Sequence, residues 1–181
     1  MQEIKPWGQL REHLQTDSIS VIKAYLDQLT AEDVVSIVSH LSEQERLRLL
    51  SVLTAEDAAE LLEDLPWVQA MELIKEMDSK EAAAIIVEFP SDEQADFLGE
   101  MSEKGAEAIM QEMPEEEADA IRELIQYEED SAGGLMVTEF LSFEEDATVG
   151  SVVKDRQSNA EKYEKYNLQY IYVTHKEQFS G

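Results

Sequence analysis

A 24-residue pattern recurs four times between Thr30 and Ile125, and the copies align without a gap. A fixed period that carries apolar columns is typical of stacked-repeat proteins, in which each unit covers the apolar face of the next. Such folds present surfaces to partners, so the repeat favours a binding or regulatory role over a buried catalytic pocket. The apolar columns are Val34, Ala58, Ala82 and Ala106; Ile37, Leu61, Ile85 and Ile109; Val38, Leu62, Ile86 and Met110; Leu41, Leu65, Phe89 and Met113; and Leu49, Leu73, Phe97 and Ile121.

Each copy is predicted to form two short helices. A small polar residue with an acid three positions later can cap the first helix, because the side chains satisfy free N–H groups of the first turn. These pairs are Thr30 with Asp33, Thr54 with Asp57, and Asp78 with Glu81. The first helix must end before a proline, which lacks an N–H group but is tolerated where the next helix starts. The prolines are Pro66, Pro90 and Pro114, and Ser42 with Glu45 gives the same start signal in the first copy.

The segment before the repeats shows weaker versions of the same features. Ile19–Leu29 resembles the second half of a repeat, so we predict that it forms a capping half-repeat. Trp7, Leu10 and Leu14 are spaced as on one face of a helix and indicate a short leading helix.

The period breaks after Ile125. Residues 127–136, YEEDSAGGLM, contain the pair Gly133–Gly134, which the interior of a helix disfavours. Beyond the junction the pattern becomes β-α-β, with a strand around Phe140, Leu141 and Phe143, a helix from Val149 to about Tyr163 that starts near Thr148, and a buried strand at Leu168–Thr174. We therefore predict a helical-repeat domain at 1–130, and a junction with an incomplete α/β domain at 131–181 that is less stable than the repeats.

The charge limits the kinds of partner. The chain has 41 Asp and Glu against 14 Lys and Arg, a formal charge of −27, and residues 30–130 hold 29 of these acids against 6 bases. Such a field repels phosphate backbones and anionic lipids, which argues against nucleic acid or bare membrane as partners. It attracts cations or a basic protein surface, although composition alone is equally explained by solubility. The sequence shows no membrane-spanning apolar run and no signal peptide, and without cysteine it has no thiolate metal site.

The repeats with their A-x-x-L-L-x-x-L-P rhythm, the junction YEEDSAGGLM and the β-α-β start resemble the cytoplasmic part of MgtE-type magnesium transporters. The resemblance implies a mainly α fold, with a right-handed superhelix of stacked helix pairs followed by part of a cystathionine-β-synthase-type (CBS) domain. It also implies a cytoplasmic, Mg²⁺-sensing module whose partners are the CBS domains and transmembrane pore of the same transporter, with a homodimer in the full-length protein. Most of those partner parts are absent from this sequence, so we expect sensing and not transport.

The same resemblance suggests four metal-site residues. Glu60 lies in DAAELLEDLP, Asp92 and Asp96 lie in PSDEQADFL, and Gly134 lies in the junction. Asp92 and Asp96 are four residues apart, which places both carboxylates on one face of a helix. The alternatives are a solvated helix residue for Glu60, and acids favoured by the helix dipole for the two aspartates. The partner carboxylates would come from CBS segments outside this sequence.

Other clusters favour structural roles. Glu115–Glu117 are interpreted as acids at a helix start, and Glu128–Asp130 as residues that cap the junction. The three histidines share no zinc-ligand spacing, and no catalytic triad, P-loop or EF-hand loop is present, so we predict that the chain is not an enzyme. The alternative function is a metal-independent helical scaffold that binds a basic protein.

Overall fold

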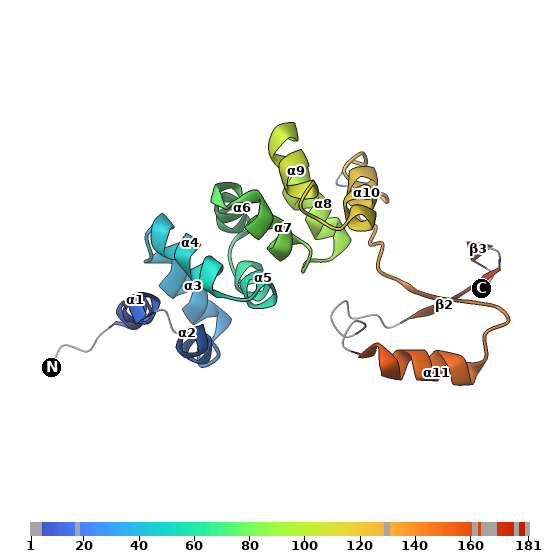
Figure 1. Ribbon diagram of the computed structural model, residues 1–181, viewed down its shortest axis with the longest axis horizontal. Coiled ribbons are helices and arrows are strands. Elements are labelled where there is room, and N and C mark those ends of the chain that lie inside the picture. The colour runs from blue at the N-terminus through green and yellow to red at the C-terminus, as the bar shows by residue number, and fades with distance from the viewer. Residues whose placement is uncertain are drawn as a thin grey trace.

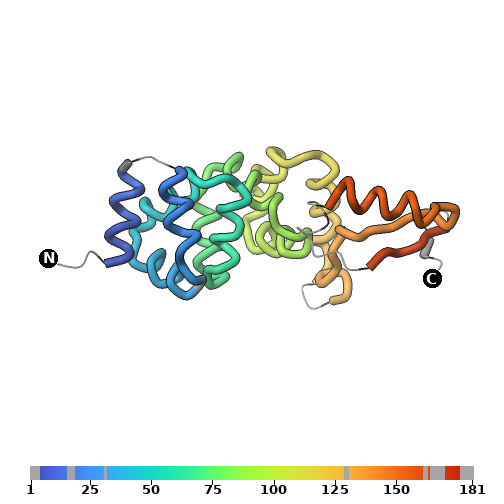
Figure 2. The backbone as a smooth tube through the Cα atoms, turned by 90° about the horizontal axis from the view of Figure 1, so that it is seen from below, coloured from blue at the N-terminus to red at the C-terminus, as the bar shows by residue number. Residues whose placement is uncertain are grey.

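The computed structural model describes residues 5–16, 19–128, 131–160, 163, 170–175 and 178–179. Helix pairs follow one another along the long axis of the molecule, and an α/β segment lies at the end far from the N-terminus (Figures 1 and 2). The helices are α1 Pro6–Thr16, α2 Ile19–Leu26, α3 Ala31–Ser39, α4 Glu43–Val52, α5 Ala55–Glu63, α6 Trp67–Glu76, α7 Ser79–Ile86, α8 Ser91–Gly99, α9 Glu103–Met110, α10 Glu115–Leu124 and α11 Val149–Ser158. The strands are β1 Leu141–Glu144, β2 Ile171–His175 and β3 Gln178–Phe179.

The 24-residue period is present in the structure. First helices begin at residues 31, 55, 79 and 103, and second helices begin at 43, 67, 91 and 115. All residues of the five apolar columns are at most 8% exposed, so the columns form the core that runs through the stack. The prediction of a mainly α fold built from stacked helix pairs, with an α/β segment after them, is confirmed.

The predicted helix starts are also confirmed, with one difference in detail. Thr30 and Ser42 each form a complete capping box with the acid three residues later, and Thr54 accepts from the Asp57 N–H. Asp78 instead accepts from the N–H of Lys80, one residue earlier than the pattern predicts. The three prolines occupy the N-cap positions of α6, α8 and α10, where they offer no side-chain cap.

The predicted leading helix is α1 and the predicted half-repeat contains α2, and the two together continue the 24-residue period as a complete pair, which the sequence pattern did not predict. Leu10 and Leu14 stand one period before Val34 and Val38, and both leucines are buried. The signal was weak because the chain has His13 where the later copies have an aliphatic residue.

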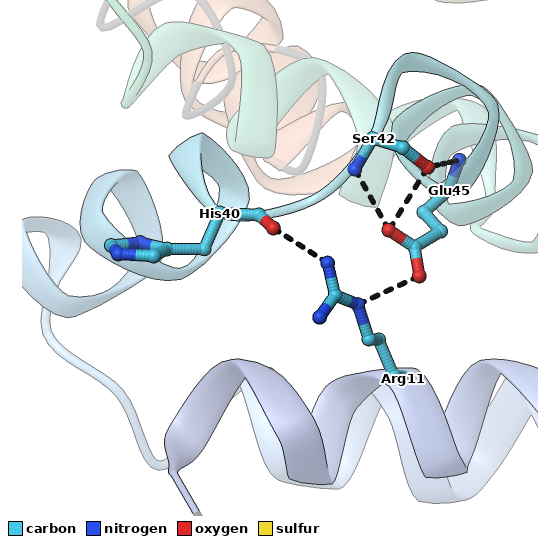
Figure 3. A network of polar contacts seen from close by, with 4 residues as sticks. All are labelled: Arg11, His40, Ser42 and Glu45. Carbon is cyan, nitrogen blue, oxygen red and sulfur yellow. Dashed lines mark hydrogen bonds and ion pairs between the residues drawn. The ribbon is translucent and has the colours of Figure 1, made fainter.

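Arg11 ties this first helix to the rest of the stack (Figure 3). Its Nε donates to Oε1 of Glu45 at 2.7 Å, and its Nη2 donates to the carbonyl of His40 at 2.7 Å. The other carboxylate oxygen of Glu45 accepts from the backbone N–H and the hydroxyl of Ser42. One glutamate therefore completes the cap of α4 and holds α1.

The β-α-β order of the C-terminal segment is confirmed. β1 pairs in parallel with β2, and β3 adds an antiparallel edge. α11 begins after its N-cap Thr148 and ends at Ser158, and beyond the turn at Asn159 the residues Ala160 and Tyr163 are again helical. The prediction that the second strand is buried is wrong for its described part. Ile171, Tyr172 and Val173 are exposed and only Thr174 is buried, while residues 168 and 169 lie outside the described residues. β-branched and aromatic content identifies a strand but cannot show whether anything covers it.

The predicted boundary between the two parts, at residues 130 and 131, lies after α10 in the chain. Residues 129 and 130, part of the predicted capping cluster, lie outside the described residues. The division into 1–130 and 131–181, and the lower stability expected for the second part, stay predictions. Among the described residues, no helix has both the length and the apolar content needed to cross a membrane.

Candidate functional site

The end of α5 and the start of α8 together form one acidic surface, which consists of Glu60, Glu63, Asp64, Asp92, Glu93 and Asp96. α5 packs one stripe of apolar side chains into the core and leaves Glu60, Glu63 and its C-cap Asp64 exposed. α8 likewise buries Phe97 and Leu98, while Asp92 and Glu93 are half-buried and Asp96 is exposed. The apolar period of the repeat thus selects which carboxylates reach the surface.

The carboxylates of the acidic surface repel one another. Burial and then the charges of Glu60 and Asp64 raise the pKa of Glu63. Burial is also the larger cause that raises the pKa of Glu93, followed by the charges of Glu63, Asp92 and Asp96. The interaction of Glu93 with Glu63 joins the acids of α5 to those of α8. The predicted ligands Glu60 on α5 and Asp92 and Asp96 on α8 therefore belong to one connected group of negative charges.

Asp92 carries an unusual feature of this surface. Its Oδ1 atom is buried, and the described residues supply no hydrogen-bond donor to it. A buried carboxylate oxygen needs a donor or a cation, since an unpaired one is costly. Asp96 lies one turn further along α8 and is exposed. Carboxylate oxygen is the ligand type that Mg²⁺ prefers, and this ion commonly uses one or two carboxylates and keeps several waters.

The sequence interpretation missed Glu63 and Glu93. Glu93 stands in the same repeat column as Glu45, which completes a capping box with Ser42. In the α8 copy the N-cap is Pro90, which has no hydroxyl to share, so the acid at this position has no capping partner there. Comparison of N-cap and third helix positions across the copies could have identified Glu93.

Glu60 lies at a second feature, a surface groove that it lines with Lys23, Asp57 and Asp64. Lys23 forms an ion pair with Asp57 across this groove. Burial would raise the pKa of Asp57, but hydrogen bonds from Lys23 and Thr54 bring it below its usual value. Lys23 thus neutralises part of the negative charge in this groove. The repulsion among carboxylates is stronger around Glu63 than in the groove.

Gly134 belongs to the turn that follows α10, not to either acidic helix. Its N–H donates to the hydroxyl of Ser131 at 3.1 Å. The neighbouring Gly133 lies under the ring of Tyr127, where an added Cβ would come within 2.4 Å of the ring carbon Cγ. The glycine pair therefore permits a tight junction, and its described contacts give no direct evidence for a metal ligand.

The chain after this turn returns to α8. The hydroxyl of Ser91 accepts from the N–H of Thr138 at 2.8 Å and donates to Oε2 of Glu139 at 2.8 Å. The backbone N–H of Ser91 also points to Oε2 of Glu139, at 3.4 Å. Asp92 is the next residue along α8. Thr138 and Glu139, in the linker between α10 and β1, therefore lie at the edge of the acidic surface. No local sequence signal connects residues that are 48 positions apart.

The acidic surface does not form a complete ion cage. Within the described ranges, no three Asp, Glu or His side chains are grouped closely enough to hold a metal ion. The surface offers single carboxylates to hydrated ions, and a second set of ligands would have to come from elsewhere.

A sequence profile of the family described as MgtE intracellular N domain matches residues 29–130. The chain belongs to this family. The matched range begins one residue before the cap of α3 and ends beyond α10, so the MgtE N domain coincides with the four regular copies of the repeat. Both helices of the acidic surface lie inside it.

Two kinds of relative extend this comparison. The magnesium transporter MgtE of Enterococcus faecalis (strain ATCC 700802 / V583) is 38% identical over 61 residues, which cover 34% of this chain and 13% of that protein. The matched part is thus a small fraction of the relative's length.

Two solved structures share the fold. The soluble part of a magnesium transporter gives a TM-score of 0.75 at 23% identity, over 96% of this chain and 68% of the other. The cytosolic domain of the Mg²⁺ channel MgtE in complex with ATP gives 0.73 at 24% identity, over 92% and 68%. The shared fold includes the α/β segment beyond the MgtE N domain, since the likeness extends over nearly the whole chain.

Proposed function

We propose that this chain is a cytoplasmic, non-enzymatic Mg²⁺-sensing module of an MgtE-type transporter. Its partners would be the CBS domains and the pore of the same protein, with a homodimer in the full-length form. The observation that carries the proposal is that carboxylates of α5 and α8 on the acidic surface lie close enough to repel one another, beside the buried Oδ1 atom of Asp92, to which the described residues give no donor. Membership of the MgtE N domain family gives that surface a magnesium context.

The mechanism follows from the charge. Without divalent ions the acidic surface disfavours the approach of another acidic face, and with ions between the faces the closed arrangement is favoured. To move a two-state gate from nearly all open to nearly all closed takes about 5.5 kcal/mol of differential binding. Several weak ions can supply this free energy together. Glu60, Asp92 and Asp96 would be ligands on this side, and Gly134 would contribute backbone at the junction.

The proposal is tested by adding millimolar magnesium to the chain and following the backbone amides of α5 and α8 by NMR. We expect saturable shifts around Glu60 and Asp92, and we expect the double variant Asp92→Asn/Asp96→Asn to lose the shifts on α8. Glu116→Gln is the matched control, because Glu116 stands one repeat after Asp92 and is exposed on α10. This variant should respond as the wild type does.

A sodium chloride series at matched ionic strength separates specific binding from screening. If magnesium and sodium produce the same shifts, the sensing proposal fails and the metal-independent scaffold for a basic partner is favoured. Loss of the response in Glu116→Gln to the same degree as in the double variant would also contradict it.

A further inference from the structure

The contact between the linker and α8 depends on a buried serine hydroxyl at the start of the helix. Ser91 is 2% exposed, although serine at the first position of a helix normally faces water. At the same position the other copies have Glu43, Trp67 and Glu115, so this hydroxyl is specific to α8. A hydroxyl can donate and accept at once, and Ser91 does both, with Glu139 and Thr138 as its partners.

Glu139 also takes the place of a helix cap. Pro90 gives α8 no side-chain cap, and the carboxylate that lies against the first turn comes from the linker. A negative group at a helix N-terminus is favoured by the helix dipole, and hydrogen bonds to a charged acceptor are stronger than neutral ones. The start of α8 is therefore satisfied by a residue outside the repeats.

Only one residue, Phe140, separates this contact from the first strand of the sheet. Phe140 follows Glu139 directly, and its ring meets the ring of Tyr172 on β2 with 6.3 Å between centroids. β1 begins at the next residue, Leu141, which pairs with Ile171 of β2. The position of Glu139 is therefore coupled to the positions of β1 and β2 through only two residues of chain.

We infer that Ser91, Thr138 and Glu139 form a latch that sets the orientation of the α/β segment on the repeats. The latch lies beside Asp92 but needs no ion, because its three hydrogen bonds join protein groups. It is a positioning element distinct from the proposed ion-binding carboxylates.

The test measures a distance across the latch in the presence of a chelator. The chain has no cysteine, so spin labels can be attached after Lys104→Cys on α9 and Gln157→Cys on α11, which are both exposed. Electron–electron resonance should give a narrow distance distribution for the otherwise unchanged chain. We expect Ser91→Ala and Glu139→Ala to broaden or shift it.

Glu145→Ala is the matched control, because Glu145 pairs with His175 inside the α/β segment. This variant should keep the narrow distribution. The latch is overturned if Glu139→Ala leaves the distribution unchanged, or if Glu145→Ala broadens it equally.

A second readout is the exchange of the Thr138 amide, which should lose protection in Ser91→Ala while amides of α3 to α6 keep theirs. If Ser91→Ala unfolds the repeats, Glu139→Ala on the linker decides the question alone. Since all samples contain chelator, a chain that never responds to magnesium could still show the latch, and the two proposals can fail separately.

Discussion

Glu93 on α8 lies within electrostatic reach of Glu63 on α5, although the two residues come from different helices and different copies of the repeat. Burial and this neighbouring charge both raise the pKa of Glu93. The stack therefore holds together carboxylates that would separate in an unfolded chain. Removal of one negative charge here should relieve repulsion, not break a favourable contact.

The first prediction is that Glu93→Gln stabilises the chain at pH 7. The gain should be below about 1 kcal/mol, because these side chains are partly exposed and solvent screens their charges. A carboxyl group whose pKa is raised on folding does not lower the free energy of unfolding at pH values below its unfolded-state pKa of about 4.3. The loss grows in the window between the unfolded-state and the folded-state pKa. The advantage of the variant over the wild type should thus be full above that window and vanish below it.

Urea unfolding of wild type and variant at several pH values between about 4 and 8, a range that starts near the ordinary carboxyl pKa, measures this difference. Glu116→Gln removes an exposed acid from α10 and serves as the control, with little change expected. An advantage of Glu93→Gln that stayed constant across the pH range would show that charge is not its cause.

The second prediction concerns the cap that Ser42 and Glu45 form. Ser42→Ala should cost about 1 kcal/mol, the usual value for loss of an N-cap. The backbone N–H of Ser42 and then Arg11 lower the pKa of Glu45, so its stabilisation is present above the ordinary carboxyl pKa and is lost as pH falls through the folded value. Thermal unfolding at neutral and acid pH would show both effects.

Ser51→Ala is the matched control on the same helix. The hydroxyl of Ser51 bonds back to the carbonyl of Arg48, a contact that adds little to helix stability. Equal losses in the Ser42 and Ser51 variants would argue against a specific cap.

The repeats could be predicted in detail because their determinants are local. Caps, prolines and apolar columns act over a few residues, and each recurs at the same position in successive copies. Leu10 and Leu14 show the limit of this method, since one histidine in an apolar column was enough to hide a complete first pair.

The candidate site could be predicted only in part, since its key relations are not local. Asp92 and Asp96 are suggested by a family resemblance, but their link to α5 depends on Glu63 and Glu93, whose approach is set by stacking. The contact of Glu139 with Ser91 depends on where the junction directs the chain. The exposure of β2 depends on what lies beside it, which residue propensity does not encode.

The third prediction is that Gln94 stabilises α8 from inside the core. Gln94 is fully buried, and its Nε2 donates to the carbonyl of Phe89 at 2.7 Å, whereas the same column holds Ala70 and Ala118 in the neighbouring copies. Gln94→Ala should cost about 1–3 kcal/mol, because it leaves that carbonyl unpaired and also creates a cavity.

Gln94→Met separates these causes, because it fills the space without donating a hydrogen bond. Urea unfolding should place its stability between that of the wild type and that of Gln94→Ala. Gln44→Ala on the exposed face of α4 is the control. If Gln94→Ala were as stable as the wild type, the hydrogen bond to Phe89 would contribute nothing.

The fourth prediction tests the junction through Gly133. A methyl group there would approach the ring of Tyr127 to 2.4 Å, so Gly133→Ala must push the ring away, at a cost of about 1–3 kcal/mol for overpacking. Tyr127→Ala removes the obstacle, and the double variant should be more stable than the sum of the two single losses indicates. Gly99→Ala is the control, since no atom lies within 4 Å of its added Cβ and alanine favours the helix. Free energies of unfolding for the four variants decide the matter: a Gly133→Ala variant as stable as Gly99→Ala, or strictly additive losses, would mean that the ring does not set the shape of the junction.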